Sequence, residues 1–286
     1  MATAFANGFH GDDASLGYIL KTLERKSYLI PGIITNPSIS VNVDGSDAYY
    51  FTRGASNVGD GSATVGSKLD YTSTGVTRKT IPLNKAIQIK DVLPLVNVSS
   101  VSADVVGDRV IYNSLIAANE FDTLGVAKIT SGTTGTDYTA VTGNVALTTA
   151  NVYQEILNAR KQFLLGNKAK GMKPTGMLVG PTAEALILQN TAFVRSTPVG
   201  DAAVQDAVIG KIGGMQVVSC PDLDETVCPF LLINAEGFAA VTNVRSLSVT
   251  AADAAGYPNG TLIGGEIGYG FEIADKSLIY VYPTAA

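Results

Sequence analysis

The stretch RGASNVGDGSATVGSKLDYTSTGVTR, residues 53–78, decides how the rest of this chain is interpreted. It is rich in Gly, Ser and Thr and poor in large apolar side chains, so it cannot form a hydrophobic core by itself. Strand-like sequence lies on both sides of it, at residues 48–52 and 76–89. The pattern predicts a long two-stranded β-hairpin that projects from the body of the protein.

A hairpin of this composition needs a surface to lie on. Loops of more than about 15 residues without secondary structure are uncommon in compact domains and are usually functional. The simplest function here is contact with a neighbouring subunit. The candidate assembly residues are the glycines and the lysine of this segment: Gly54, Gly59, Gly61, Gly66, Lys68 and Gly75.

The sequence before the hairpin predicts an arm. Residues 14–30 have the composition of a short helix, but Pro31-Gly32 and Asn36-Pro37 stop it and favour extended chain. From Ile39 the apolar residues alternate with polar ones, which is the pattern of a strand with one buried face.

Two helices are predicted after the hairpin. The first follows Pro94, with Ser99 or Ser100 as its N-cap, and ends near Glu120. Its apolar stripe is formed by Val101, Val105, Tyr112, Leu115 and Ile116. The second has Thr148 or Thr149 as its cap and ends at Gly166. Its apolar face is formed by Val152, Ile156, Ala159 and Phe163.

The remaining sequence alternates between strand and helix patterns. We expect a strand at residues 176–180, a helix from Thr182 to Gln189 opened by Pro181, and a polar loop through Gly200. Strands are then expected at residues 213–220, 230–233, 246–249, 263–273 and 278–282. No repeat with a period of 20–50 residues is evident, which disfavours solenoids and propellers. This part is α/β in texture, and with the arm, the hairpin and the closing strands the fold class expected for the whole chain is α+β.

Charge and composition exclude several classes of protein. Charged residues make up only 16% of the 286 residues and the net charge is −5, which argues against a protein that grips nucleic acid through its phosphates. The N-terminal sequence lacks the basic and apolar regions of a secretory signal, and no apolar run is long enough to span a membrane. We expect a protein made in the cytosol, with no membrane contact.

The residues that carry catalysis in other proteins are sparse. His10 is the one histidine, so a nucleophile–histidine system would have to be built on it. Residues 166–171 begin like a phosphate loop but lack the Lys-Ser/Thr that must follow, and they close a helix instead of opening one. The glycines at residues 210–214 and 264–270 lack dinucleotide-binding spacing, so bulges or tight turns are the expectation.

One acidic turn and two cysteines complete the candidates. Asp222, Asp224 and Glu225 either form a weak cation site or an exposed acidic turn, and the missing calcium-loop spacing favours the turn. Cys220 and Cys228 flank this turn and are expected to be a buried pair of free thiols rather than a disulfide or metal site. No enzyme, cofactor or metal centre is predicted.

Five segments carry a resemblance to a known family. Lys79 to Val92 looks like the returning strand of an extended loop, and residues 101–121 look like a spine helix. Residues 147–157 with 173–186 are similar to the helix, strand and helix of an axial domain, and residues 209–223 to a Gly-rich strand that ends in a turn. The order of parts resembles the major capsid proteins of tailed bacteriophages with the Hong Kong 97-type coat fold, which encapsulin nanocompartments also use.

The resemblance implies an organisation for the whole chain. It assigns residues 1–38 to an N-terminal arm, 39–92 to an extended hairpin loop, 93–146 to a peripheral domain with the spine helix, 147–240 mainly to an axial α/β domain, and 241–286 to closing strands, mainly of the peripheral domain. It also implies self-assembly into pentamers and hexamers of an icosahedral phage head that encloses double-stranded DNA without sequence-specific binding. The location would be the virion, after assembly in the host bacterial cytoplasm.

The implied partners are further copies of the chain, a separate scaffolding protein, a portal and, as an option, decoration proteins. Scaffolding is expected to be separate because no long, charged, helical segment precedes the arm. Three other interpretations stay open: an encapsulin-like shell protein, a phage tail-tube or decoration protein, and an α/β enzyme that binds a small molecule.

Overall fold

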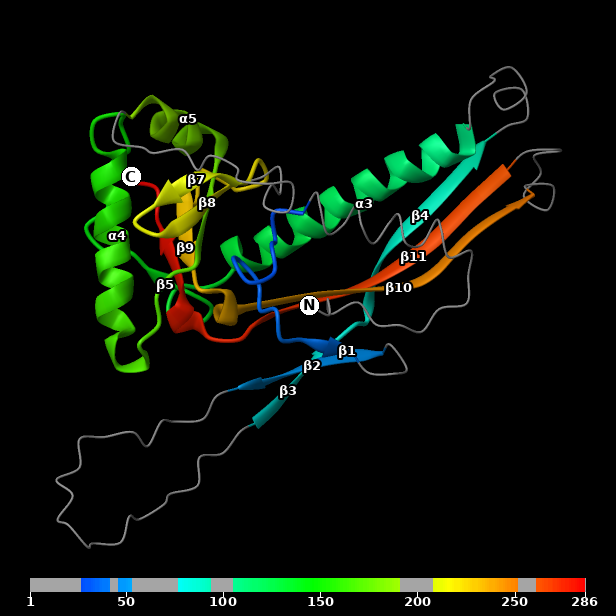
Figure 1. Ribbon diagram of the computed structural model, residues 1–286, viewed down its shortest axis with the longest axis horizontal. Coiled ribbons are helices and arrows are strands. Elements are labelled where there is room, and N and C mark those ends of the chain that lie inside the picture. Colours follow the sequence, from blue (N-terminus) through cyan, green and yellow to red (C-terminus); the bar gives the residue numbers. More distant parts are fainter. Residues whose placement is uncertain are drawn as a thin grey trace, which may run out of the picture.

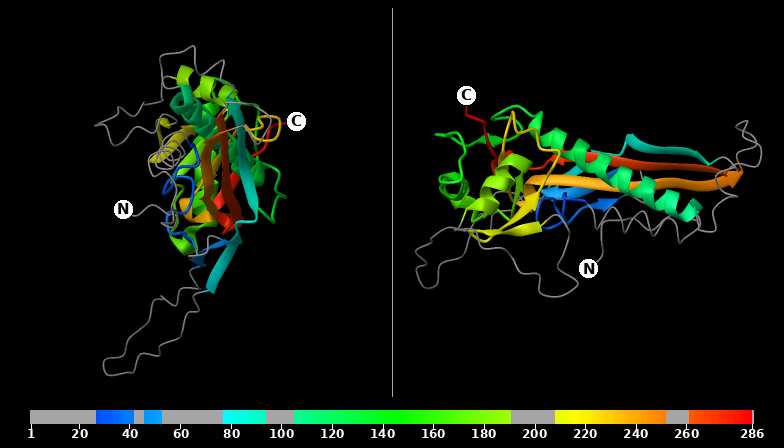
Figure 2. Two further views of the ribbon diagram at one scale, coloured as in Figure 1. Left: turned by 90° about the vertical axis from the view of Figure 1, so that its right-hand side faces the viewer. Right: turned by 90° about the horizontal axis from the view of Figure 1, so that it is seen from above.

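Residues 27–41, 46–52, 77–93, 105–190, 208–251 and 261–285 are described by the structure, a computed structural model. Helices and strands are mixed, and the strands form three sheets. Figure 1 shows a lobe that carries α4 and α5, a long extension that carries α3, β4, β10 and β11, and β2 and β3 leaving below the extension. Seen from above in Figure 2, α3 runs alongside the long strands.

The lobe is built on a sheet of six strands in the order β5-β12-β9-β6-β8-β7. Their bounds are Thr139–Ala140, Ile279–Tyr282, Phe230–Ile233, Gly176–Val179, Met215–Ser219 and Val208–Ile212. β6, β9 and β12 are buried at every residue. Strands that are covered on both faces have a continuous apolar sequence instead of alternation. The apolar runs at residues 230–233 and 176–179 therefore predicted these strands correctly.

Two different cores cover the faces of this sheet. Met177, Phe230 and Tyr282 point to the core formed with α4 (Val152–Gly166) and α5 (Pro181–Gln189). Leu178 and Leu231 point to the other core, which contains the end of α3. The lobe is thus a sheet between helical layers, and it has a complete core of its own.

The sequence prediction for α4 is confirmed in its core and corrected at its start. Its buried residues are the four predicted ones, Val152, Ile156, Ala159 and Phe163, and it ends at Gly166. The N-cap is Asn151 rather than Thr148 or Thr149. Thr148 supports the start of the helix, because its carbonyl accepts a hydrogen bond from the Val152 N–H at 3.0 Å. α5 begins at Pro181, as predicted, since proline fits the first turn of a helix.

The extension is a three-stranded sheet, here called the long sheet, in the order β10-β11-β4. β10 spans Phe238–Ala251, β11 spans Thr261–Ile273 and β4 spans Lys85–Leu93. α3, Val105–Thr130, packs on one face of it, where Phe121 lies 4.9 Å from Phe271 between ring centroids. Residues 264–270, expected as bulges or tight turns, lie inside the continuous strand β11, and the irregularity in its pairing with β10 falls opposite them, between Val244 and Ser246.

α3 differs from its prediction in length and in its buried face. It continues to Thr130 instead of ending near Glu120. Tyr112 and Ile116, predicted in the apolar stripe, are 51% and 53% exposed, and Leu115 is exposed as well. The buried face instead carries Ser114 and small side chains such as Ala117 and Ala118, because the helix lies close to the sheet. The predicted caps Ser99 and Ser100 lie outside the described residues.

The third sheet, here called the hairpin sheet, has the order β1-β2-β3. β1 spans Ser40–Val41, β2 spans Asp47–Thr52 and β3 spans Thr77–Pro82, and β2 pairs with β3 in antiparallel register from Asp47–Pro82 to Thr52–Thr77. The predicted single returning strand over residues 76–89 is wrong. It is divided after Pro82, and the second piece, β4, joins the long sheet.

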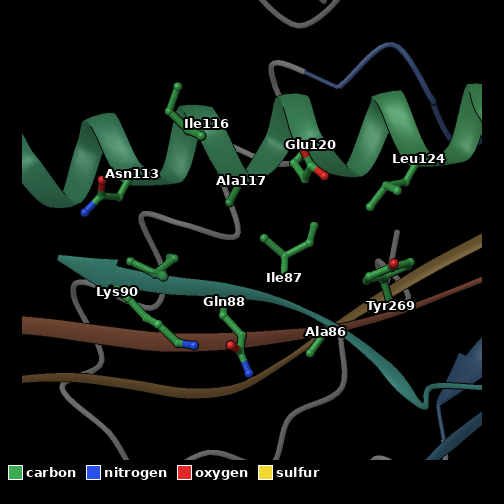
Figure 3. Close-up of a pocket in the computed structure, with 11 residues that line it drawn as sticks. Ala86, Ile87, Gln88, Lys90, Asn113, Ile116, Ala117, Glu120, Leu124 and Tyr269 are labelled. Carbon is green, nitrogen blue, oxygen red and sulfur yellow. The ribbon is translucent and has the colours of Figure 1, made fainter.

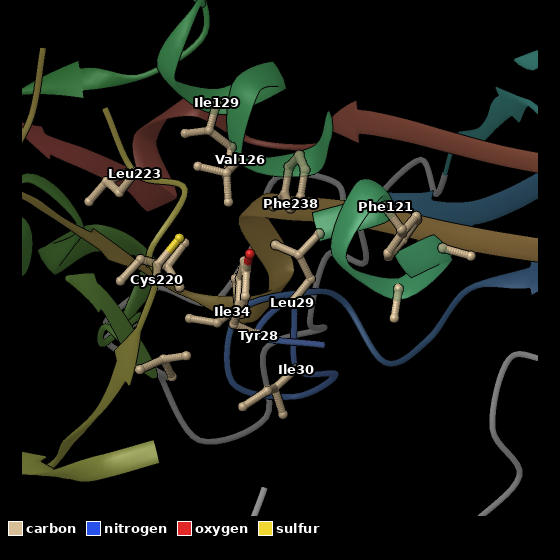
Figure 4. Packing of buried hydrophobic residues seen from close by; sticks show 14 of the residues in the cluster. Tyr28, Leu29, Ile30, Ile34, Phe121, Val126, Ile129, Cys220, Leu223 and Phe238 are labelled. Carbon is tan, nitrogen blue, oxygen red and sulfur yellow. The ribbon is translucent and has the colours of Figure 1, made fainter. Parts of the chain in front are cut away.

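The described end of the predicted arm lies in the core of the protein. Tyr28, Leu29, Ile30 and Ile34 are buried, and Figure 4 shows them between α3 and the segment with Cys220 and Leu223. Pro31-Gly32 makes a tight turn in which the Ile30 carbonyl accepts from Ile33, and Gly32 has φ +82°, a value that favours glycine. The residues of the predicted helix before Ser27 lie outside the described part.

Candidate assembly surfaces

The hairpin sheet has one buried and one exposed face. Ala48, Tyr50 and Ile81 are buried against Ala239 and Val241 of β10. The opposite face carries Phe51, whose exposed fraction is 60%. We call Tyr49, Phe51 and Arg78 the aromatic face; the Tyr49 and Phe51 rings meet edge to face at 5.9 Å, and the Arg78 guanidinium lies 4.0 Å from the Tyr49 ring centroid.

The edge of the hairpin sheet is also open. Among the described residues β3 pairs with β2 alone, and its residues Thr77 to Thr80 are exposed. Such an edge is able to accept a strand from another chain through backbone hydrogen bonds. The six candidate residues of the hairpin, Gly54, Gly59, Gly61, Gly66, Lys68 and Gly75, lie outside the described residues, as does His10.

A second exposed apolar surface lies on α3. Figure 3 shows the groove between α3 and β4, with Ile87 pointing toward the helix and Ile116 pointing away from the strand. The groove has a volume of about 510 Å³, and Glu120 and Lys90 lie on its rim. With Tyr112 and Leu115, Ile116 forms an outer face that a soluble monomer would leave in water.

A third surface is an apolar groove of about 590 Å³ on the lobe. Its walls come from residues 145–147, the start of α5 and the residues after β12, including Thr284. The Tyr282 hydroxyl closes its floor by donating to the Val145 carbonyl at 2.9 Å.

The acidic turn serves the fold. Glu225 accepts hydrogen bonds from the Thr182 and Ala183 N–H groups at the start of α5, where negative charge is favourable. Asp224 accepts from Thr226, and these bonds hold the pKa of its carboxyl below the ordinary value. Asp222 accepts from the Tyr28 hydroxyl. Among the described residues no three His, Cys, Asp or Glu side chains gather as a metal site.

The two cysteines are free thiols and both are buried, as the sequence predicts. Burial raises the pKa of each thiol to about 12, so both stay protonated near neutral pH. The turn between Cys220 and Cys228 therefore carries no reactive thiolate.

Lys170, just after α4, is held by side chains from the turn before β12. Lys170 donates to Asp275 at 2.5 Å and to Ser277 at 2.6 Å, so this segment closes the helix against the turn before β12. The Gly213-Gly214 pair, expected as a turn or bulge, is the turn between β7 and β8, and both residues have positive φ.

A buried carboxyl group escaped the sequence prediction. Asp122 on α3 is 1% exposed and accepts hydrogen bonds from the Ser27 hydroxyl at 2.5 Å and the Tyr28 N–H at 3.0 Å. Burial raises its pKa to about 7, although these two bonds act in the opposite direction. Its position within an otherwise small and apolar helix face was the available signal.

No helix among the described residues is long and apolar enough to cross a membrane.

Comparison with known proteins identifies this architecture. No protein-family model and no curated protein matches the chain. Among solved structures, the capsid of cyanophage P-SCSP1u is similar with a TM-score of 0.58 and 16% identity over 84% of each chain. The capsid of an empty GTA particle is similar with a TM-score of 0.58 and 14% identity, over 100% of this chain and 95% of that one.

A third structure, the mature capsid of bacteriophage PhiM1, is similar with a TM-score of 0.53 and 13% identity, over 100% of this chain and 91% of that chain. The likenesses to the GTA and PhiM1 capsids extend over the whole of this chain, so they include the long sheet, the helix on it and the lobe. The chain therefore has the mixed helix-and-sheet fold of phage capsid structures.

Proposed function

We propose that this chain is a major capsid protein with the Hong Kong 97-type coat fold, which self-assembles into the pentamers and hexamers of an icosahedral phage head. The observation that carries the proposal is the capsid fold in a chain whose described part exposes apolar side chains on the hairpin sheet and on α3. Because water disfavours such surfaces, copies of the chain gain free energy by covering them.

The proposed organisation follows the parts of the fold. α3 is the spine helix of a peripheral domain with the long sheet, and the six-stranded sheet with α4 and α5 is the axial domain. β12 lies in the lobe, so the closing strands would serve both domains. β1 to β3 form the base of the extended loop.

Contact between subunits would use the hairpin. Its open β3 edge and the aromatic face would lie on the next copy, and the glycines of residues 54–75 would let one sequence follow slightly different neighbours. Arg78 and Lys79 give this base a positive charge that suits an acidic neighbour, and the chain as a whole carries a net charge of −5.

The shell would enclose double-stranded DNA without gripping it. The acidic balance of the chain suits a container in which DNA slides during packaging. We place the protein in the virion after assembly in the host cytoplasm, with a separate scaffolding protein, a portal and optional decoration proteins as partners. No catalytic activity is part of the proposal.

The hairpin gives a direct test of the proposed function. Replacing residues 53–76 with Asn-Gly joins the register pair Thr52–Thr77 through a two-residue turn, which is the favoured connection of adjacent antiparallel strands. We expect the full-length chain to form closed particles of megadalton size in light scattering and electron microscopy. The shortened chain should stay folded and form none.

Two results would contradict this proposal. Normal shells from the shortened chain would show that assembly does not need the hairpin. A full-length chain that stays monomeric or forms tubes, with the proposed scaffolding protein present, would contradict the proposed shell. Particles that contain a protein cargo in place of nucleic acid would favour an encapsulin-like compartment.

A further inference from the structure

The hairpin sheet is connected to the long sheet at a joint, which packs against glycines of β11 and is contacted by Arg245 of β10. The joint is residues 82–84, between β3 and β4. Figure 1 shows β2 and β3 leaving the extension at an angle to β10 and β11. What fixes this angle decides where the aromatic face and the open β3 edge point, and therefore which neighbour they reach.

β11 presents a nearly bare backbone to the joint. Gly264, Gly268 and Gly270 lie on the same face of the strand, because side chains alternate along it. A Cβ atom added at Gly270 would lie 2.7 Å from the Ile81 side chain and 2.9 Å from the Pro82 carbonyl oxygen. The joint thus rests directly on the backbone of β11, which any larger residue at position 270 would prevent.

A break in the register of β10 supplies the group that holds the joint. Pairing with β11 passes from Val244–Ile267 to Ser246–Glu266, so Arg245 is the extra residue of a β-bulge. A bulge redirects the side chain that it carries. The Arg245 guanidinium crosses Gly268, where an added Cβ would lie 2.7 Å from Nε and 3.1 Å from Cζ.

The guanidinium makes two contacts across this glycine. It donates to Glu266 Oε1 at 2.7 Å, and its other terminal nitrogen donates to the carbonyl oxygen of Leu83, in the joint itself. The Leu83 N–H donates to the Ser46 carbonyl at 3.0 Å, which ties the same residue to the start of β2. Leu83 is thereby held from β10 on one side and from the hairpin sheet on the other.

We propose that Arg245 is a positioning residue for assembly: the bulge in β10 aims its guanidinium across Gly268 at the Leu83 carbonyl and fixes the direction in which the hairpin leaves the body. The ion pair with Glu266 is a separate contact made by the other terminal nitrogen, and the contact with Leu83 is the one that sets the joint. This inference rests on the proposed function for its consequence in shells, but the geometry of the joint is measurable in a single subunit.

Four variants separate the parts of this device. Arg245→Gln removes both contacts, and Gly268→Ala keeps the arginine but pushes its guanidinium off the joint. Glu266→Gln removes only the ion pair. Gly264→Ala is the matched glycine control, because its added Cβ would meet only Ser248 Oγ at 3.4 Å, an ordinary contact.

The direction of the hairpin is measured with two spin labels. Cysteines introduced at the exposed positions Lys79 on β3 and Lys161 on α4 accept the labels, since both native cysteines are buried. Dilute full-length subunits should give one narrow distance distribution in wild type, Glu266→Gln and Gly264→Ala. In Arg245→Gln and Gly268→Ala its width should at least double, while the circular dichroism of the subunit is unchanged.

Shell formation supplies the second readout. Arg245→Gln and Gly268→Ala should give at least tenfold fewer closed shells of wild-type diameter, with open or misshapen sheets in their place. Narrow distributions in both variants would overturn the inference, and so would a broad one in Glu266→Gln, which would assign the role to the ion pair. A wild type that forms no shells would refute the proposed function alone, because the distance measurement stands without it.

Discussion

The six-stranded sheet of the lobe and the hairpin sheet differ in how many of their faces are buried within the subunit. The lobe buries both faces of β6, β9 and β12 inside its own subunit. The hairpin sheet buries one face on β10 and leaves the other, with Phe51, in water. The difference teaches that the lobe buries its apolar side chains within one subunit, whereas the hairpin sheet keeps an exposed aromatic face, which the proposed partner copy would cover.

The largest effect is expected from the complete region. Phe230 is fully buried and stacks on Tyr282 with 4.5 Å between ring centroids. Phe230→Ala should lower the free energy of unfolding by about 3–5 kcal/mol, because it removes apolar contacts and leaves a cavity. Urea denaturation of the subunit measures this. Phe230→Leu, the control, should lower the free energy of unfolding by less than half as much. An equally small decrease for Phe230→Ala would mean that the lobe is not the main core.

A medium effect on the free energy of unfolding is expected at Asp122 of α3, where the chain segment that leads to β1 is bound. Asp122 anchors Ser27 and Tyr28, and burial raises its pKa from 3.8 to about 7. Between pH 4 and 7 the Asp122 carboxyl is therefore protonated in the folded chain and ionised in the unfolded chain. The free energy of unfolding consequently falls as pH rises through this window. The slope is at most about 1.4 kcal/mol per pH unit.

The measurement compares urea unfolding of wild type and Asp122→Asn across this pH range. The variant should gain stability relative to wild type as pH rises toward 7 and keep a constant difference above it. Asp108→Asn, at an exposed position of the same helix, should follow wild type. Parallel curves for wild type and Asp122→Asn would mean that the Asp122 carboxyl does not titrate in this window.

The smallest effect on the subunit is expected at the open face of the hairpin sheet. Phe51→Thr keeps a strand-forming residue and should change the free energy of unfolding by no more than about 0.5 kcal/mol. Shell assembly should nevertheless require a higher protein concentration, as read from light scattering. Tyr50→Thr, one residue away on the buried face, should destabilise the subunit itself. Equal changes in the free energy of unfolding for Phe51→Thr and Tyr50→Thr would contradict the assignment of one exposed and one buried face to the hairpin sheet.

Local pattern was sufficient where packing is simple. The spacing of Val152, Ile156, Ala159 and Phe163 predicted the buried face of α4, and the apolar runs predicted β6 and β9. The signals were sufficient because these elements meet a continuous core, in which large apolar side chains always point inward.

Sequence pattern failed where packing is close or the surface is shared. On α3 two of the large apolar residues of the predicted stripe, Tyr112 and Ile116, face outward, and the small residues Ala117 and Ala118 lie beneath this part of the helix. The division of the returning strand after Pro82 depends on which sheet each half meets. The Arg245 contact depends on a bulge in β10 for which no local signal was recognised. The candidate glycines of residues 54–75 remain a prediction.

The place of β12 has a consequence for synthesis. This strand lies between β5 and β9 in the sheet, yet it follows both in the sequence. A nascent chain that has not yet reached residue 279 therefore carries a lobe with an unpaired β9 edge and half-open cores. Residues 279–282 are thus the last part of the lobe to be made, and the β9 edge and both cores are closed only when this strand is in place.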